Sequence, residues 1–124
     1  MIHIERGKEK EAFIAFANMA VAKLADREYS SFLALFDSSR LSETDLILAL
    51  KYLDESRPIL KIDDPIKCKC ENRRIDIIPY KSGRGYAMDY DLTTNGEIND
   101  LTIQFEFLVE VEGYSVSLED LHTL

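Results

Sequence analysis

The sequence predicts an α+β fold in which three N-terminal helices pack on one face of a mostly antiparallel, curved sheet. Two observations lead to this prediction. In the first half of the chain, apolar residues recur every three or four positions, which is the period of a helix with one buried face. In the second half, apolar and polar residues alternate, which is the period of a strand. Helices that precede the strands, instead of alternating with them, favour α+β over α/β.

Three segments have the helical period, and we expect helices at about residues 8–24, 29–36 and 43–54. The third segment also has a start signal. The Ser42 side chain can accept the backbone N–H of Asp45 while the Asp45 side chain reaches back to Ser42, which is the arrangement of a capping box.

Five strands are expected after the helices, at about residues 66–70, 75–80, 86–94, 101–111 and 114–120. The first is predicted to be a short edge strand, because the lysines and arginines around it would discourage pairing with the edge of another sheet. The fourth, 101–111, has the clearest alternation in the chain and is the centre of the predicted sheet.

The last three strands are predicted to form an antiparallel meander. Asn95-Gly96 and Glu112-Gly113 separate them, and such residues tolerate the positive φ angles of tight turns. The side of the meander that should face the helices is apolar and comprises Tyr86, Met88, Tyr90, Leu92, Leu101, Ile103, Phe105, Phe107, Val109, Val111, Tyr114, Val116 and Leu118. Because this side contains no carboxylate or histidine, it indicates a filled core rather than a catalytic pocket.

The composition indicates one globular domain over residues 1–124, with 46% apolar and 31% charged residues. The first residues lack the pattern of a signal peptide, and Asn18 and Lys23 interrupt the longest apolar-rich stretch, so we expect a cytosolic protein. Cys68 and Cys70 would point to the same side of a strand, which makes a mutual disulfide awkward, and two cysteines are too few for a four-ligand zinc site. We therefore expect reduced thiols, no metal and no cofactor.

Charge is unevenly distributed along a chain whose net charge is −8. Residues 86–124 carry nine Asp or Glu and no Lys or Arg, whereas residues 56–85 carry eight Lys or Arg and four Asp or Glu. An acidic sheet repels nucleic acid and anionic membranes and attracts cationic protein surfaces. We expect the basic segment to pair with acidic residues of its own chain or of a second copy in a homodimer.

The candidate partner-binding residues are carboxylates that the alternation places on the outer side of the meander: Asp89, Asp91, Glu106, Glu110 and Glu119. One interpretation is a solvated face that keeps the protein in solution, since one-sided sheets commonly expose charge. The other is a docking surface for a basic protein, with Leu108 as an apolar contact.

Catalysis finds little support in the sequence. His122 lies beside Asp120, but such a pair needs a third positioned group in order to act, and no nucleophile motif accompanies it. No catalytic residue is therefore assigned.

Two short motifs, Arg40-Leu41-Ser42 at the start of the third helix and Leu118-Glu119-Asp120-Leu121-His122 at the end of the meander, accompany this layout. In both respects the chain resembles a small bacterial family of unknown function. The resemblance implies a cone-shaped α+β fold similar to nuclear transport factor and ketosteroid isomerase. Related small proteins of this fold include immunity proteins of contact-dependent and polymorphic toxin systems.

The resemblance and the acidic face together suggest an immunity protein that neutralises a cognate basic toxin. A nuclease toxin would suit the charge, because proteins that bind a polyanion are usually basic. The alternative is a cone-fold enzyme or small-ligand binder with a pocket between the helices and the sheet. A general interaction module is a third interpretation.

Overall fold

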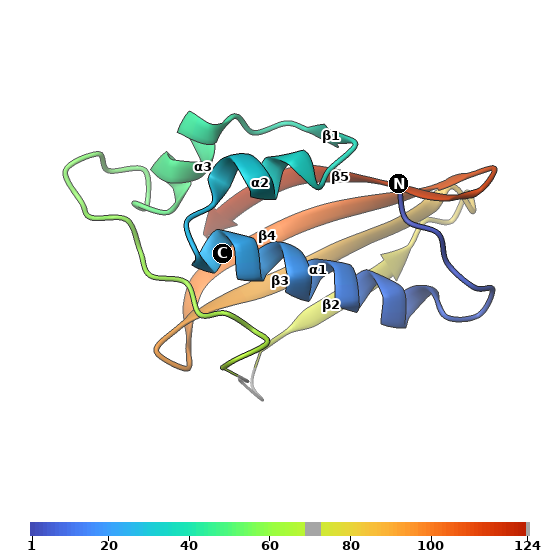
Figure 1. Cartoon of the computed structure of the whole chain (residues 1–124), viewed down its shortest axis with the longest axis horizontal. Helices are drawn as coiled ribbons and strands as arrows, with labels where there is room; N and C mark the ends of the chain where they lie inside the picture. The colour runs from blue at the N-terminus through green and yellow to red at the C-terminus, as the bar shows by residue number, and fades with distance from the viewer. Residues whose placement is uncertain (69–72, 124) are drawn as a thin grey trace.

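The computed structural model describes residues 1–68 and 73–123 of the chain. Its helices are α1 (Glu9–Ala25), α2 (Tyr29–Ala34) and α3 (Glu43–Ala49). Its strands are β1 (Ser38–Ser39), β2 (Ile75–Pro79), β3 (Gly85–Thr94), β4 (Glu97–Glu110) and β5 (Gly113–Thr123). The helices lie together on one side of the sheet, so the predicted α+β class is confirmed (Figure 1).

The sheet has the strand order β1-β5-β4-β3-β2, and only the β1–β5 pair is parallel. The predicted meander is therefore present as β3, β4 and β5. Asn95 and Gly96 form the two-residue turn between β3 and β4, with φ angles of 53° and 80°. Positive φ at both positions is what a tight hairpin with the natural twist of its strands requires.

Aromatic side chains fill the space between the helices and the sheet. Phe13 of α1 is fully buried and stacks on Phe107 of β4, with ring centroids 4.0 Å apart. Phe16 packs edge-on against Phe105 and Phe107. The side of the meander predicted to be core is thus packed against α1 along most of its length.

The apolar alternation overestimates the core at the end of β4. Val109 and Val111 were predicted to face the helices, but their exposed fractions are 51% and 101%. Val111 lies in the turn between β4 and β5, and the tip of this hairpin extends beyond the helices (Figure 1). An alternating pattern reports which side a residue faces, but it does not report whether anything covers that side.

The helix predicted over 43–54 ends at Ala49, because Tyr52 and Leu53 have positive φ angles of 53° and 61°. The backbone N–H of Leu53 donates to the carbonyl of Leu48, which closes the last turn. The Tyr52 hydroxyl donates to the carbonyl of Asn99 in β4 at 2.7 Å, which fixes this exit from the helix.

The strand predicted over 66–70 is wrong where the structure describes it. Residues 66–68 form a turn in which the backbone N–H groups of Ile66 and Cys68 donate to Asp64. Residues 69 and 70 lie outside the described residues. The structure instead adds β1, which is too short to show any period in the sequence.

Other element boundaries agree with the prediction to within a few residues. The helix predicted over 29–36 ends at Ala34, and the strand predicted over 114–120 continues to Thr123. Within the described ranges, no helix is long and apolar enough to cross a membrane.

Candidate functional site

The side of the sheet that points away from the helices carries mainly polar side chains, and we call it the open face. Residues opposite one another in an antiparallel pair point to the same side. The register therefore joins Asp76 to Asp89, Asp91 to Thr102, and Glu106 to both Ala87 and Ser117. The open face consists of Asp76, Ile78, Ala87, Asp89, Asp91, Thr102, Gln104, Glu106, Leu108, Glu110, Ser115, Ser117, Glu119, Asp120 and His122.

A β-bulge in β5 places two consecutive carboxylates on the open face. Gln104 is opposite Asp120 and Phe105 is opposite Leu118, so Glu119 is an extra residue in the ladder. Leu118 and Leu121, on either side of the two acidic residues, are both buried in the core. Glu119 and Asp120 consequently both line the polar side of the sheet.

Arg74, just before β2, holds the carboxylates at one edge of the open face. Its guanidinium group donates to Asp91 at 3.1 Å and to Asp76 at 2.9 Å, and it lies 3.9 Å from a carboxylate oxygen of Asp89. Thr102 donates a further hydrogen bond to Asp91 at 2.9 Å. Arg74 therefore reduces the repulsion between Asp76 and Asp89, which lie directly opposite each other.

Other polar side chains position the remaining carboxylates near the middle of the open face. Gln104 donates to Asp89 at 3.0 Å, and the Tyr80 hydroxyl donates to Glu106 at 2.7 Å. The Arg40 Nε atom, from the segment after β1, lies 3.2 Å from a carboxylate oxygen of Glu119. These carboxylates are thus held in defined positions instead of moving freely in solvent.

Tyr80 remains a hydrogen-bond donor at neutral pH. Burial raises the pKa of Tyr80 to about 12, together with the hydrogen bond to Glu106 and the negative charges of Glu106 and Glu119. Tyr80 is thus hydrogen-bonded to Glu106 of β4 and lines the same cavity as Glu119 of β5.

A cavity of about 340 Å³ lies on the open face between the two edges of the sheet. Arg40 and Tyr80 border it from opposite edges, and Gln104, Glu119 and Asp120 line it between them. Such a cavity, lined by both hydrogen-bond acceptors and donors, can receive a polar or charged side chain of a partner.

The open face carries a net negative charge even after its cations are counted. It holds seven carboxylates, against Arg40, Arg74 and, at the adjacent turn, Lys81 and Arg84. The excess is therefore three negative charges. Ile78 lies on the same face with 54% of its surface exposed, which provides an apolar contact between the charged groups.

The five carboxylates predicted from the sequence have different environments. Asp89, Glu106 and Glu119 are half-buried and hydrogen-bonded or ion-paired, and Glu110 is exposed near the β4–β5 turn. Asp91 is only 4% exposed, so it can position Arg74 but offers little surface to a partner.

Several residues that shape the open face were not predicted from the sequence: Arg40, Arg74, Ile78, Tyr80 and Gln104. The sequence Arg74-Ile75-Asp76 could have indicated the contact of Arg74 with the open face, because residues two apart in a strand point to the same side. The prediction that the basic segment pairs with acidic residues of its own chain is confirmed at Arg74. Which acidic residues it meets depends on strand register, which the sequence did not reveal.

A second cavity, of about 350 Å³, lies between α3 and the ends of β4 and β5. Its lining is largely apolar, with polar groups from Asp45, Tyr52, Asp120 and His122. The His122 Nδ1 atom is 3.2 Å from Asp120, but their orientation does not make a hydrogen bond, and this buried atom has no partner among the described residues. The pair therefore lacks the aligned hydrogen bonds that a catalytic dyad uses.

Tyr90 is the one inward-facing tyrosine of the sheet that is fully buried, among the described residues. Its hydroxyl donates to Asn18 of α1 at 2.7 Å and accepts from Arg73 at 3.1 Å. Burial raises the pKa of Tyr90 to about 12, although the charge of Arg73 opposes this. A neutral, paired phenol of this kind stabilises the helix–sheet interface and is a poor general base.

Within residues 1–68 and 73–123, no three His, Cys, Asp or Glu side chains are grouped to hold a metal ion. Cys68 is a free thiol. Cys70, the other predicted thiol, lies outside the described residues.

Residues 21–124 match a family that is described as a domain of unknown function (DUF7668). The match covers most of the chain, so the protein belongs to this family. Comparison with curated proteins gives no match, and comparison with solved structures gives none either.

Proposed function

We propose that the protein binds a cationic protein through the open face and that it serves as a cytosolic immunity protein against a bacterial toxin. The observation that carries this proposal is an uncovered sheet face whose carboxylates are held in place by the protein's own side chains. Asp89, Glu106 and Glu119 each have a hydrogen-bond or ion-pair partner within 3.2 Å. Fixed carboxylates lose less side-chain entropy on binding than free ones.

The charge of the open face favours a partner with a basic surface. Complementary charge mainly accelerates the encounter of two proteins, which suits an inhibitor that must reach a toxin before the toxin acts. Nuclease toxins are good candidates, because a protein that binds a polyanion presents lysine and arginine side chains at its active site. An acidic face that covers such a site would block the substrate.

The open face also offers features that solvated acidic surfaces lack. The cavity between Arg40 and Tyr80 can accept one basic side chain, with Glu119 and Asp120 as hydrogen-bond acceptors. Ile78, on the edge strand β2, can be buried by the partner and would contribute apolar area at this side of the contact. A surface that only keeps the protein in solution needs neither feature.

The test compares two neutralised variants as baits for proteins from the native host. The first carries Asp89→Asn, Glu106→Gln, Glu110→Gln and Glu119→Gln on the open face. The matched control carries Glu5→Gln, Glu55→Gln, Glu97→Gln and Asp100→Asn, which removes the same charge from exposed positions outside that face. We expect the wild type and the control to capture one basic protein that the open-face variant loses.

A captured protein must then inhibit growth when expressed alone, and co-expression of the wild type must relieve the inhibition. Equal capture by both variants would exclude the open face as the binding surface. A captured partner without toxicity would retain the protein-binding proposal but exclude the immunity role.

The cavity beside α3 favours a second candidate function, which is binding of a small molecule with an apolar body and a polar group. The polar side chains that line this cavity, Asp45, Tyr52 and His122, could hydrogen-bond to such a ligand. Ligand screening by thermal shift should then give hits that His122→Ala abolishes. Hits that persist in this variant would argue against this cavity as the ligand-binding site.

A further inference from the structure

We propose that the outer face of α1 is the contact surface of a two-fold symmetric dimer of this chain. α1 is apolar on nearly its whole circumference. Phe13, Ala17 and Leu24 face the sheet and are buried, yet the opposite side carries Ala12, Ala15, Met19 and Ala22. A helix that is apolar all round is normally covered on every side.

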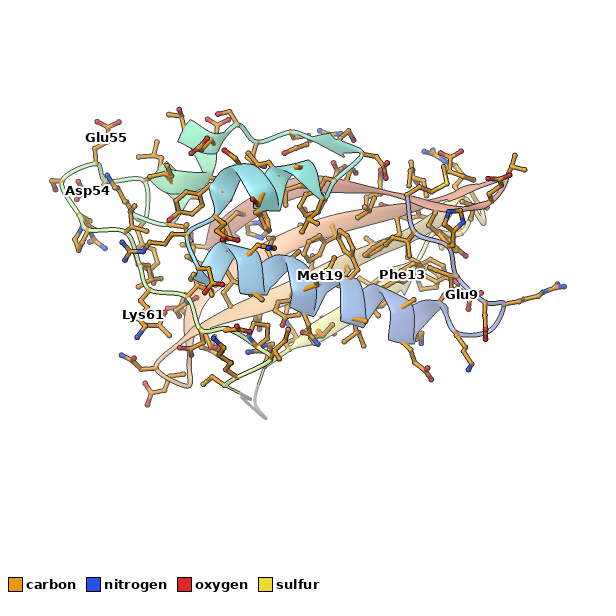
Figure 2. All side chains as sticks on the ribbon, viewed as in Figure 1. Glu9, Phe13, Met19, Asp54, Glu55 and Lys61 are labelled. Carbon is orange, nitrogen blue, oxygen red and sulfur yellow. The ribbon has the colours of Figure 1, made fainter. Side chains whose placement is uncertain are left out.

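The outer face of α1 is uncovered in the single chain. Met19 is 42% exposed and Ala15 is also exposed. Figure 2 shows Met19 on the side of α1 that faces the viewer, where no other element of the described chain lies over the helix. Beside this face lies an apolar groove of about 520 Å³, formed by Ala12, Ala15, Phe16 and Met19 of α1, the N-terminal residues Met1 and Ile2, and Leu35 just after α2.

The charges at the two ends of α1 make its outer face complementary to itself. If two copies of α1 cross antiparallel around a point between Ala15 and Met19, these two residues lie opposite each other. Ala12 then lies opposite Ala22. In the same register Glu11 is opposite Lys23, and Lys8 is opposite Asp26.

Helical geometry places these residues on one side of α1. Seen along the helix axis, at 100° per residue, Lys8, Glu11, Ala15, Met19, Ala22 and Asp26 fall within about one quarter of the circumference. Ala12 and Lys23 border this sector on the side away from Glu11, about 120° from it for Lys23, so the Glu11–Lys23 pairs form when the two helices cross at an angle that brings these flanks together. A two-fold axis repeats every pair, so the contact would contain two Glu11–Lys23 pairs and two Lys8–Asp26 pairs around an apolar centre.

A second copy fits this surface better than an unrelated partner does. The charge pattern matches its own reversal, and alanines at the centre allow two helices to approach closely. The Met19 side chain of each copy could then enter the groove beside Phe16 and Leu35 of the other. This inference does not depend on the proposed function, because it concerns the helical side of the molecule and leaves the open face free.

The experiment measures the dimer dissociation constant by sedimentation equilibrium, using the whole chain at low salt. Glu11→Lys and Lys23→Glu should each weaken the dimer by about tenfold, because like charges then face each other twice. The double variant Glu11→Lys/Lys23→Glu restores opposite charges across the two-fold axis. It should bind itself to within about threefold of the wild type.

The pairwise rescue separates dimerisation from effects within one chain. Residues 11 and 23 are too far apart on one helix to contact each other, and Lys23 already pairs with Glu28 of its own chain at 3.2 Å. Rescue by the double variant therefore reports a contact between copies. A double variant that is no better than the single variants would overturn the antiparallel register.

A second pair of variants tests the apolar centre. Met19→Asp should abolish the dimer, whereas Leu53→Asp, which changes another exposed apolar residue away from α1, should leave it intact. Circular dichroism is the control that checks whether both variants fold. A wild-type protein that is monomeric at every concentration measured, or a dimer unaffected by Met19→Asp, would overturn the proposal.

Discussion

Arg74 shows how one side chain makes the open face possible. It contacts Asp76 and Asp91, and the hydrogen bond to Asp91 is the main reason that the pKa of Arg74 is raised above its ordinary value. Asp91 is 4% exposed, so without a cation its charge would be buried and poorly compensated. The same guanidinium group that stabilises the sheet therefore also fixes the acidic edge offered to a partner.

Replacing Arg74→Met should lower the free energy of unfolding by about 2 kcal/mol, measured by urea denaturation. The estimate lies below that for a fully buried ion pair because the Arg74 side chain is 37% exposed and water can reach the site. Adding Asp91→Asn should recover at least half of the loss, since a neutral amide can still accept from Thr102. Arg84→Met, on the exposed β2–β3 turn, is the control and should change stability by less than about 0.5 kcal/mol. An Arg74 variant as stable as this control would contradict the conclusion that Arg74 compensates the buried charge of Asp91.

Asp63 has a different role, which is to hold the β3–β4 turn. Its carboxylate accepts from the backbone N–H groups of Asn95 and Gly96 at 3.0 and 2.8 Å, and from the Thr93 hydroxyl at 2.9 Å. Burial by itself would raise the pKa of Asp63, but these hydrogen bonds outweigh it, and the pKa lies below its ordinary value.

The sign of this pKa shift gives a pH prediction. Because the pKa of Asp63 is lower in the folded state than in the unfolded state, its stabilisation is complete above about pH 4–5 and is lost as the pH falls through the folded-state pKa. Asp63→Asn should therefore cost about 1–3 kcal/mol at pH 7, and its difference from the wild type should shrink below about pH 4. Urea denaturation across this pH range measures both values, with Glu97→Gln as the exposed control. A difference that stays constant with pH would show that the charge of Asp63 is not what stabilises the turn.

At the scale of elements, the sequence correctly predicted the strands and turns that depend only on residues close together in the chain. The alternation over 101–111 correctly identified β4, and Asn95-Gly96 correctly identified a hairpin turn. The period failed at Leu118-Glu119-Asp120-Leu121, where the apolar residues are three apart. The predicted strand therefore stopped at 120, whereas in the structure a bulge at Glu119 restores the alternation and β5 continues to Thr123.

The start of α3 is the clearest local prediction that is confirmed. The Ser42 side chain accepts the Asp45 N–H at 3.1 Å, and the Asp45 carboxylate accepts the Ser42 N–H at 3.0 Å. The predicted end of α3 was wrong. The observed end depends on the hydrogen bond from Tyr52 to Asn99 of β4, and no local sequence pattern indicates a contact between residues so far apart.

Ser42→Ala should destabilise the protein by about 1 kcal/mol, because the Asp45 N–H loses its acceptor at the first turn of a seven-residue helix. Thermal denaturation measures the loss, and hydrogen exchange should accelerate in α3 before it does in β4. Ser56→Ala, at a serine in the exposed loop that follows α3, is the control. Unchanged exchange in α3 would show that packing alone holds this helix.

At the scale of the whole molecule, the sequence predicted an acidic side of the sheet but not its detailed chemistry. Charge counts over residues 86–124 were enough to predict the excess of carboxylates. The positions of Arg40, Tyr80 and Arg74 over those carboxylates required the strand order β1-β5-β4-β3-β2, in which both edges of the sheet supply a partner. Contacts between residues so far apart in the chain produce no periodic pattern in the sequence.

The two surfaces of the molecule suggest separate interactions. The open face is acidic, whereas the outer face of α1 is apolar and self-complementary in charge. A dimer formed through α1 would leave two open faces free, each able to bind a cationic protein.

The most direct test of the central claim is the association rate constant between the protein and a purified basic partner, measured for the open-face variant and its matched control at low and high salt. We predict that the open-face variant associates at least about tenfold more slowly at low salt, that high salt removes most of this difference, and that the control behaves as the wild type. Equal association rate constants for the wild type and the open-face variant at low salt would contradict the claim that the open face binds the partner.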